Sequence, residues 1–186
     1  MKFNKAAMFG LDARIALAIF GALSVISGAA LYSAIQQAQT TGLVTELYEL
    51  EKAIEQYMLD TGADLTENSG SSLNYGDLLV DNSIKGWNGP YISIKGTLTT
   101  YYLDHPTYGN ILIRKMANNL GGAVNTGCTV APCYYWIQMN GLEPQHLINI
   151  DTMIDGSVSA TEGKVRTIDT SDNSVFIKGP LMLKQP

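Results

Sequence analysis

The longest apolar stretch of the chain lies near its N-terminus. Residues 13–35 contain one charged side chain, Arg14, and no proline. As a single helix they would extend for about 35 Å, and the apolar core of a bilayer is about 30 Å thick. The hydroxyl groups of Ser24, Ser27 and Ser33 can bond back to the helix backbone. We therefore expect a membrane-spanning helix over residues 8–39.

A second hydrophobic pattern follows over residues 40–62. Its apolar positions recur every three or four residues, as on one face of an amphipathic helix. They are Leu43, Leu47, Leu50, Ile54 and Tyr57. Gly62 is typical of a C-terminal helix cap. The two patterns together predict one helix over residues 9–61, apolar on all sides in its first part and amphipathic in its second.

Beyond residue 62 the apolar runs become short. Residues 63–72 are polar and predict a loop. Apolar runs between turn signals predict strands at 91–94, 98–103, 111–114 and 134–139, and edge strands at 165–168 and 175–178. Apolar residues at helical spacing predict a helix over residues 144–154. The C-terminal residues 181–183 are expected to pack on the head as a tail. We expect an α+β fold, in which the amphipathic part of the long helix covers a small antiparallel sheet of a globular head at 63–186.

Composition and charge limit the kinds of molecule that this chain is expected to bind. The 186 residues carry a net charge of −5, and no cluster of Lys or Arg is present to neutralise phosphates, which argues against a nucleic-acid partner. Lys2 and Lys5 are the charges that precede the apolar helix. Because positive residues stay in the cytoplasm, we expect the N-terminus inside and the head outside the membrane.

The two cysteines, Cys128 and Cys133, lie in the expected exported part. An oxidising compartment favours a disulfide between them. A metal site would need a second Cys or His pair nearby, and a redox motif would need the spacing C-x-x-C. We therefore predict a disulfide that closes a short loop.

The N-terminal charges are unusual for a secretory signal. Asp12 and Arg14 lie inside the leading edge of the apolar run, which is also too long for a cleaved signal. An acidic residue inside a membrane span is unfavourable unless it has a partner. The alternative to such a partner is an ordinary signal-anchor helix, in which both charges lie at the lipid headgroups.

These residues resemble the N-termini of type IV pilins and of the pseudopilins of type II secretion systems. Precursors in these families have a short basic leader, a cleavage point, four mostly apolar residues, one acidic residue, and an apolar helix with a glycine nine residues after the acid. Cleavage between Ala7 and Met8 would make Asp12 the fifth residue, with Gly21 nine residues further on. A rival cut between Gly10 and Leu11 would put an isoleucine in the acidic position, so we prefer the first register. The chain departs from the family in having Ala7 where Gly is usual and Asp12 where Glu is usual.

The resemblance implies a division of the chain and a set of partners. Residues 1–7 would be a prepilin leader, 8–39 a transmembrane and filament-core helix, 40–62 its amphipathic continuation, and 63–186 a head of pilin-like fold. Asp12 would pair with the free amine at Met8 of an adjacent subunit, and Arg14 with Asp12 of a neighbour. The expected partners are further copies in a helical homopolymer, minor pilins, the inner membrane, prepilin peptidase, an assembly platform protein and its ATPase.

No catalytic motif is present in the sequence, and we expect a structural subunit and not an enzyme. The two histidines do not form H-E-x-x-H, and no G-x-S-x-G occurs; His105 precedes a proline and is expected to be a solvated loop residue. We expect no organic cofactor. Calcium is a candidate ligand, because some major pseudopilins hold this ion near the C-terminus. The acids placed there are Asp151, Asp155, Asp169 and Asp172.

Two further features of the head resemble the family, and two rival functions stay open. Trp87 begins a turn that resembles the tryptophan-glycine-proline-tyrosine turn of pseudopilin heads, and residues 150–166 resemble a recurrent pilin-like ending. The first rival is a membrane-anchored periplasmic binding domain or enzyme that never polymerises. The second is a minor pilin that acts as a tip adhesin.

Overall fold

The computed structural model describes residues 5–93, 95–122, 127–168 and 173–186, with side chains from Gly10 onward. The chain divides into two compact units, Met1–Gly42 and Leu43–Pro186. The first unit is helical throughout its described part, and the second contains the sheet. We describe each unit by itself.

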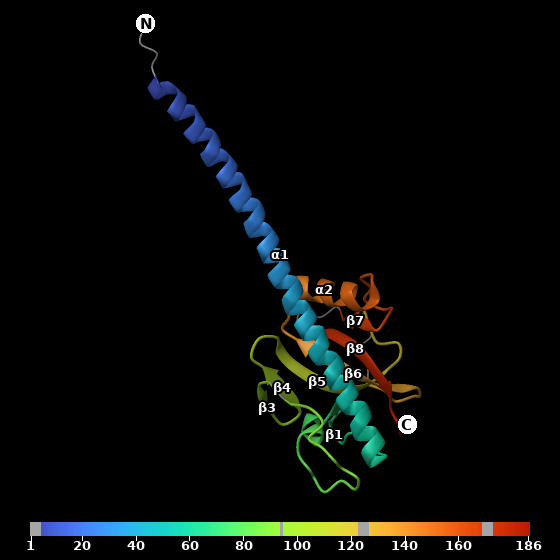
Figure 1. Cartoon of the computed structure of the whole chain (residues 1–186). Helices are drawn as coiled ribbons and strands as arrows, with labels where there is room; N and C mark the ends of the chain where they lie inside the picture. Colours follow the sequence, from blue (N-terminus) through green and yellow to red (C-terminus); the bar gives the residue numbers. More distant parts are fainter. Residues whose placement is uncertain (1–4, 94, 123–126, 169–172) are drawn as a thin grey trace. The chain divides into compact units, whose positions relative to one another are not determined.

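The helix α1 (Lys5–Thr61) contributes to both units (Figure 1). It ends where the sequence predicts, because Gly62 adopts a left-handed conformation with φ of 65°. The Gly62 N–H donates to the carbonyl of Met58 at 2.9 Å, which closes the last turn of the helix. The predicted helix and its glycine cap are both confirmed.

The described strands of the second unit form one eight-stranded sheet of order β1-β2-β5-β6-β8-β7, with β4 beside β5 and β3 beside β4. All seven pairings between strands are antiparallel. The strands are β1 (Glu67–Ser69), β2 (Ser72–Leu73), β3 (Thr97–Leu98), β4 (Tyr102–His105), β5 (Gly109–Ala117), β6 (Cys133–Asn140), β7 (Val165–Thr167) and β8 (Val175–Leu181). A short 3-10 helix, η1 (Tyr75–Leu78), follows β2, and α2 (Pro144–Asp155) connects β6 to β7.

The core lies between the sheet and the second part of α1. Leu43, Leu50 and Ile54 of the helix join Tyr135 and Ile137 of β6 in one buried cluster. Successive strand residues point to opposite faces, and Trp136 accordingly lies in a second cluster with Met116, Leu120, Ile168 and Phe176. The amphipathic stripe therefore covers one face of the sheet, as expected.

Several predicted element boundaries need correction. The polar stretch 63–72 contains β1 and the first residue of β2, because Ser72 and Leu73 pair with Arg114 and Ile113 of β5; strand pairing overrides polar composition here. The predicted strand at 98–103 is divided between β3 and β4. Thr99 turns the chain between them, since its N–H bonds to the carbonyl of Tyr102 at 2.9 Å.

The strand expected at 91–94 is wrong for its described residues. Residues 91–93 form no strand, and residue 94 lies outside the described part. Tyr91 is instead fixed through its N–H, which donates to the Leu78 carbonyl at 2.8 Å. Its ring packs edge-on against the rings of Tyr57 and Trp87, with centroids 5.7 Å away in each pair. A helix over residues 144–154 and strands near 111–114, 134–139, 165–168 and 175–178 are present.

Candidate functional site

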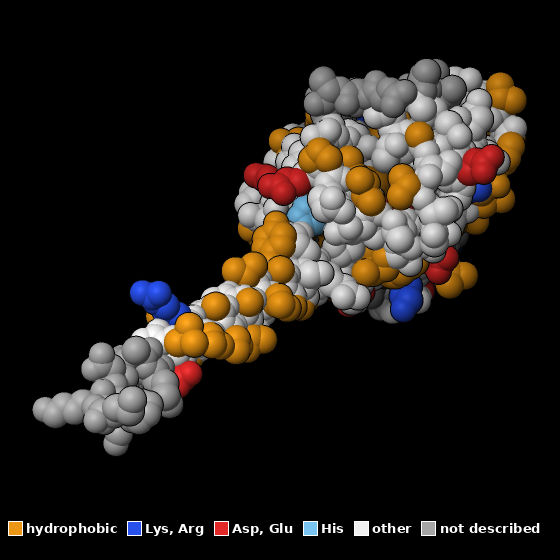
Figure 2. All heavy atoms as spheres, turned by 90° about the horizontal axis from the view of Figure 1, so that it is seen from above, with side chains coloured by type: hydrophobic (Ala, Val, Ile, Leu, Met, Phe, Trp, Pro, Cys, Tyr) orange, Lys and Arg blue, Asp and Glu red, His pale blue; other side chains and the backbone are white. Residues whose placement is uncertain are grey.

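The first unit exposes its apolar side chains. Every Leu, Ile, Val, Phe and Tyr between residues 11 and 35 is exposed, from 47% for Ile35 to 73% for Val25. Figure 2 shows these hydrophobic side chains along the helix. None of the most apolar window of α1 is buried, and by length and composition the helix can cross a membrane, a test that signal sequences also pass.

Among the side chains that the structure describes, those of the predicted assembly residues do not form a site within this unit. Asp12 and Arg14 are both exposed, and side chains two positions apart on a helix do not face each other. Ala7 and Met8 lie on α1. At Gly21 an added Cβ would meet no atom within 4 Å. The roles of these residues in processing and assembly stay predictions, as does the rival cut after Gly10.

His105 is not the solvated loop residue that the sequence predicts. It ends β4, and its side chain is 5% exposed. Its Nδ1 accepts the N–H groups of Thr107 and Tyr108 at 3.1 and 3.2 Å, so a neutral ring carries its proton on Nε2. This Nε2 lies 3.2 Å from Oε2 of Glu46 on α1, without the alignment of a hydrogen bond.

Glu46 also binds the exposed Lys95, whose Nζ donates to Oε1 at 2.5 Å. That hydrogen bond and the charge of Glu46 raise the pKa of Lys95. Glu46 thus joins α1 to two separate segments of the head. Sequence patterns did not predict this pair, because residues 46 and 105 are far apart in the chain. The one sequence feature that points to it is that Glu46 lies next to the apolar stripe of the helix, beside Leu47.

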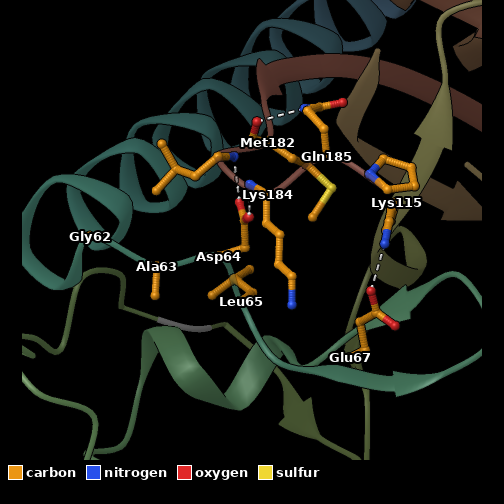
Figure 3. A pocket seen from close by; sticks show the side chains of 11 residues that line it. Gly62, Ala63, Asp64, Leu65, Glu67, Lys115, Met182, Lys184 and Gln185 are labelled. Atoms are coloured by element: carbon orange, nitrogen blue, oxygen red, sulfur yellow. Dashed lines mark hydrogen bonds and ion pairs between the residues drawn. The ribbon is translucent and has the colours of Figure 1, made fainter. Parts of the chain in front are cut away.

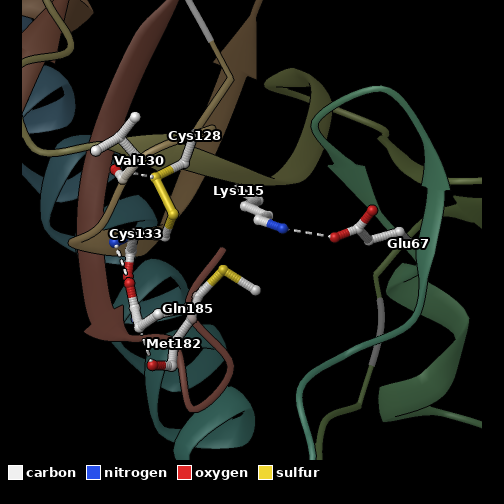
Figure 4. Close-up of a disulfide and its surroundings, with 7 residues drawn as sticks. All are labelled: Glu67, Lys115, Cys128, Val130, Cys133, Met182 and Gln185. Carbon is white, nitrogen blue, oxygen red and sulfur yellow. Dashed lines mark hydrogen bonds and ion pairs between the residues drawn. A yellow bond between two sulfur atoms is a disulfide. The ribbon is translucent and has the colours of Figure 1, made fainter.

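The predicted disulfide between Cys128 and Cys133 is present, with the two Cα atoms 5.6 Å apart. The C-terminal tail packs beside it (Figure 4). The Cys133 N–H donates to Oε1 of Gln185 at 2.7 Å, and the Met182 N–H donates to the Cys133 carbonyl at 3.1 Å. Cys133 itself is fully buried, so the bridge lies under the tail.

Asp64 fastens the same tail to the segment that follows α1 (Figure 3). Its Oδ1 accepts from Tyr135 Oη at 2.8 Å and from the Leu183 N–H at 3.0 Å, and its Oδ2 accepts from the Lys184 N–H at 2.6 Å. Burial and the charge of Asp64 raise the pKa of Tyr135, so this phenol remains a donor. Local sequence patterns could not reveal this role, because Tyr135 lies 71 residues from Asp64 and the two tail residues lie 119 and 120 residues away.

A hollow of about 650 Å³ lies between this tail and the loop after α1. Lys115 and Glu67 on its wall form an ion pair at 2.7 Å. Asp64, also on its wall, holds the backbone of Leu183 and Lys184. The arrangement fits a structural role, since the one carboxylate that gathers several donors there, Asp64, is used to fix the tail.

The calcium candidates divide into two pairs. Asp151 Oδ2 accepts the Ser159 N–H at 2.9 Å, and Asp155 Oδ2 accepts the Val165 N–H at 2.7 Å, so both acids support the backbone after α2. Asp169 and Asp172 lie outside the described residues. Within the described residues, no group of three or more His, Cys, Asp or Glu could hold a metal ion.

These features define an α+β protein with a long N-terminal helix, of which the second part packs on an antiparallel sheet. Comparison with family models, curated proteins and solved structures finds no significant match.

Proposed function

We propose that this chain is a structural subunit of a filament of the type IV pilus or type II secretion pseudopilus class. It is inserted in the bacterial inner membrane and polymerises through α1. The observation that carries the proposal is that every Leu, Ile, Val, Phe and Tyr side chain between residues 11 and 35 is exposed. Exposed apolar surface of this extent needs lipid or other protein to cover it.

Asp12 supports polymerisation in particular. It is an exposed acid at the leading edge of this apolar segment, and a lipid environment alone leaves such a charge without a partner. Cleavage between Ala7 and Met8 by prepilin peptidase creates an amine, and an adjacent subunit brings that cation to Asp12. An ion pair in apolar surroundings is favourable when both partners are present and hydrogen-bonded, so the pair would fix the register of neighbouring helices.

The head supplies the surface of such a filament. The buried residues of its main core cluster all belong to the second unit, so we expect the head to fold without polymerisation. Contacts between heads of successive copies would be heterologous, since contacts of this kind extend into open helical assemblies.

The test compares Asp12→Asn with the matched control Asp12→Glu in cells that make the full chain with its assembly machinery. Electron microscopy of sheared surface material should show filaments for the natural chain and for Asp12→Glu, and none for Asp12→Asn. N-terminal sequencing of the mature protein should begin at Met8.

Two results would contradict the proposal. Filaments of normal number from Asp12→Asn would remove the role of the acid. A membrane-bound protein that keeps Met1 and forms no filaments would instead favour an anchored periplasmic domain that does not polymerise.

A further inference from the structure

An apolar groove lies beside α2 on the second unit. It has a volume of about 350 Å³, and its described lining includes Leu147, Ile148, Val158 and Ile168. Ile148 is 44% exposed and Val158 is 58% exposed. Large apolar side chains that stay open to solvent on a folded head are typical of a surface that another molecule covers.

One charged side chain, Asp151, contributes to the wall of this groove. It is 1% exposed, and only its Oδ2 has a hydrogen bond within the described residues, to the N–H of Ser159. Burial raises the pKa of Asp151, with a smaller contribution from Asp155. A buried carboxylate oxygen without a partner is unfavourable, so the groove suits a cation with apolar neighbours.

The C-terminal tail offers that combination. Leu181 is 49% exposed, Leu183 is 53% exposed, and Lys184 is exposed beside them. No described residue forms an ion pair with the Lys184 ammonium group. The backbone of this segment is already held by Asp64, which accepts the N–H groups of Leu183 and Lys184, and such preorganisation lowers the entropy lost on binding.

The groove and the tail cannot meet within one copy. The tail is bonded to Asp64, directly after the end of α1, whereas α2 lies well away from the C-terminus (Figure 1). Two complementary surfaces at separate places on one molecule form a heterologous contact, which repeats from copy to copy without closing.

We infer that the tail of one copy docks in the α2 groove of a second copy, with the ammonium group of Lys184 paired to Asp151. Leu181 and Leu183 cover the apolar wall on either side of this ion pair. The inference rests on the proposed function, because it assigns the contact between successive heads of the filament.

Disulfide trapping between two differently tagged full-length chains tests the contact. One chain carries Ile148→Cys in the groove and the other carries Leu183→Cys on the tail. The native cysteines are already paired with each other. Mixed dimers that contain both tags are expected from this combination. Dimers that form only when both chains carry Ile148→Cys would mean a two-fold contact and would overturn the inference.

The ion pair is tested by adding Lys184→Glu to the Leu183→Cys chain. Trapping should fall by about tenfold or more, because the variant brings a negative charge to a buried carboxylate. Lys52→Glu is the matched control, since Lys52 is also exposed, and trapping should not change. Equal trapping with and without Lys184→Glu would overturn the pairing.

The same cells separate this inference from the filament proposal. Filaments without mixed dimers would overturn the docking contact and leave the filament intact. Mixed dimers without filaments would support the docking contact and contradict the proposed function.

Discussion

The two parts of α1 use their hydrophobic residues in different ways. Between residues 11 and 35 every large apolar side chain is exposed, whereas Leu43, Ile54 and Tyr57 in the second part are fully buried. The difference follows from the sequence, because the first part is apolar on all sides and the second has one apolar stripe. A stripe can be covered by one sheet, but a helix that is apolar all round needs cover on every side.

The two parts of α1 differ in whether the chain itself covers their apolar surface. The second part of α1 and the sheet bury each other's apolar faces, so the head's stability is expected to depend on those contacts. The first part has no such cover from the side chains that the structure describes in its own unit. Its residues should therefore affect membrane insertion and assembly, with little effect on the unfolding of the head.

Matched truncations in the two parts should give the largest contrast. Ile54→Ala removes a fully buried side chain and should lower the free energy of unfolding of the head by about 2–5 kcal/mol. Ile26→Ala removes a side chain that is 65% exposed and should change the same quantity by less than about 0.5 kcal/mol. Denaturant titration in detergent, followed by fluorescence of the two tryptophans, measures both. Similar losses for both variants would contradict the division.

A charge in the first part should act on the membrane instead. Leu23→Arg places a cation in the apolar segment and should oppose insertion by about 2.5–3.5 kcal/mol. Leu59→Arg changes a residue that is 78% exposed in the second part, and it should leave insertion unchanged. Membrane flotation of both variants measures the inserted fraction. Full insertion of Leu23→Arg would argue against a membrane span.

A smaller effect is expected from the polar contacts of the second part. Lys164 Nζ donates to Oε1 and Oε2 of Glu51 at 3.0 and 2.7 Å, and this partly buried pair should contribute about 1 kcal/mol. Glu51→Gln should reduce the free energy of unfolding by that amount, and less so at high salt. Glu55→Gln, at an exposed position of the same helix, is the control and should show almost no change.

The same contrast explains which features the sequence could predict. The long helix and its Gly62 cap, α2, the main strands and the disulfide all depend on local spacing, and they are present. The strand β2 and the buried position of His105 depend on partners far along the chain, Arg114 and Ile113 for β2 and Glu46 for His105. Local polarity could not reveal either of them.

The candidate site follows the same division. The pattern around Asp12 predicted an assembly role from residues that are neighbours in sequence, and that role stays a prediction. Asp64 and Asp151 were not predicted to bind the backbone. Each accepts from residues brought near by folding, Lys184 for Asp64 and Ser159 for Asp151, and a lone aspartate in a loop or helix gives no signal of this.

The smallest expected effect concerns Asp151, on the wall of the apolar groove beside α2. Burial raises its pKa in the folded state, so the folded protein holds this proton to higher pH than the unfolded chain. The contribution of this proton to stability is therefore complete at a pH below the usual pKa of aspartate, and it is lost as pH rises through the raised value.

Asp151→Asn should lack this loss of stability in a pH series of unfolding measurements in detergent. In assembled protein the Lys184 of a second copy would favour the charged carboxylate and lower its pKa, so the difference between natural chain and variant should shrink. An equal difference in both states would count against Lys184 as the partner of Asp151.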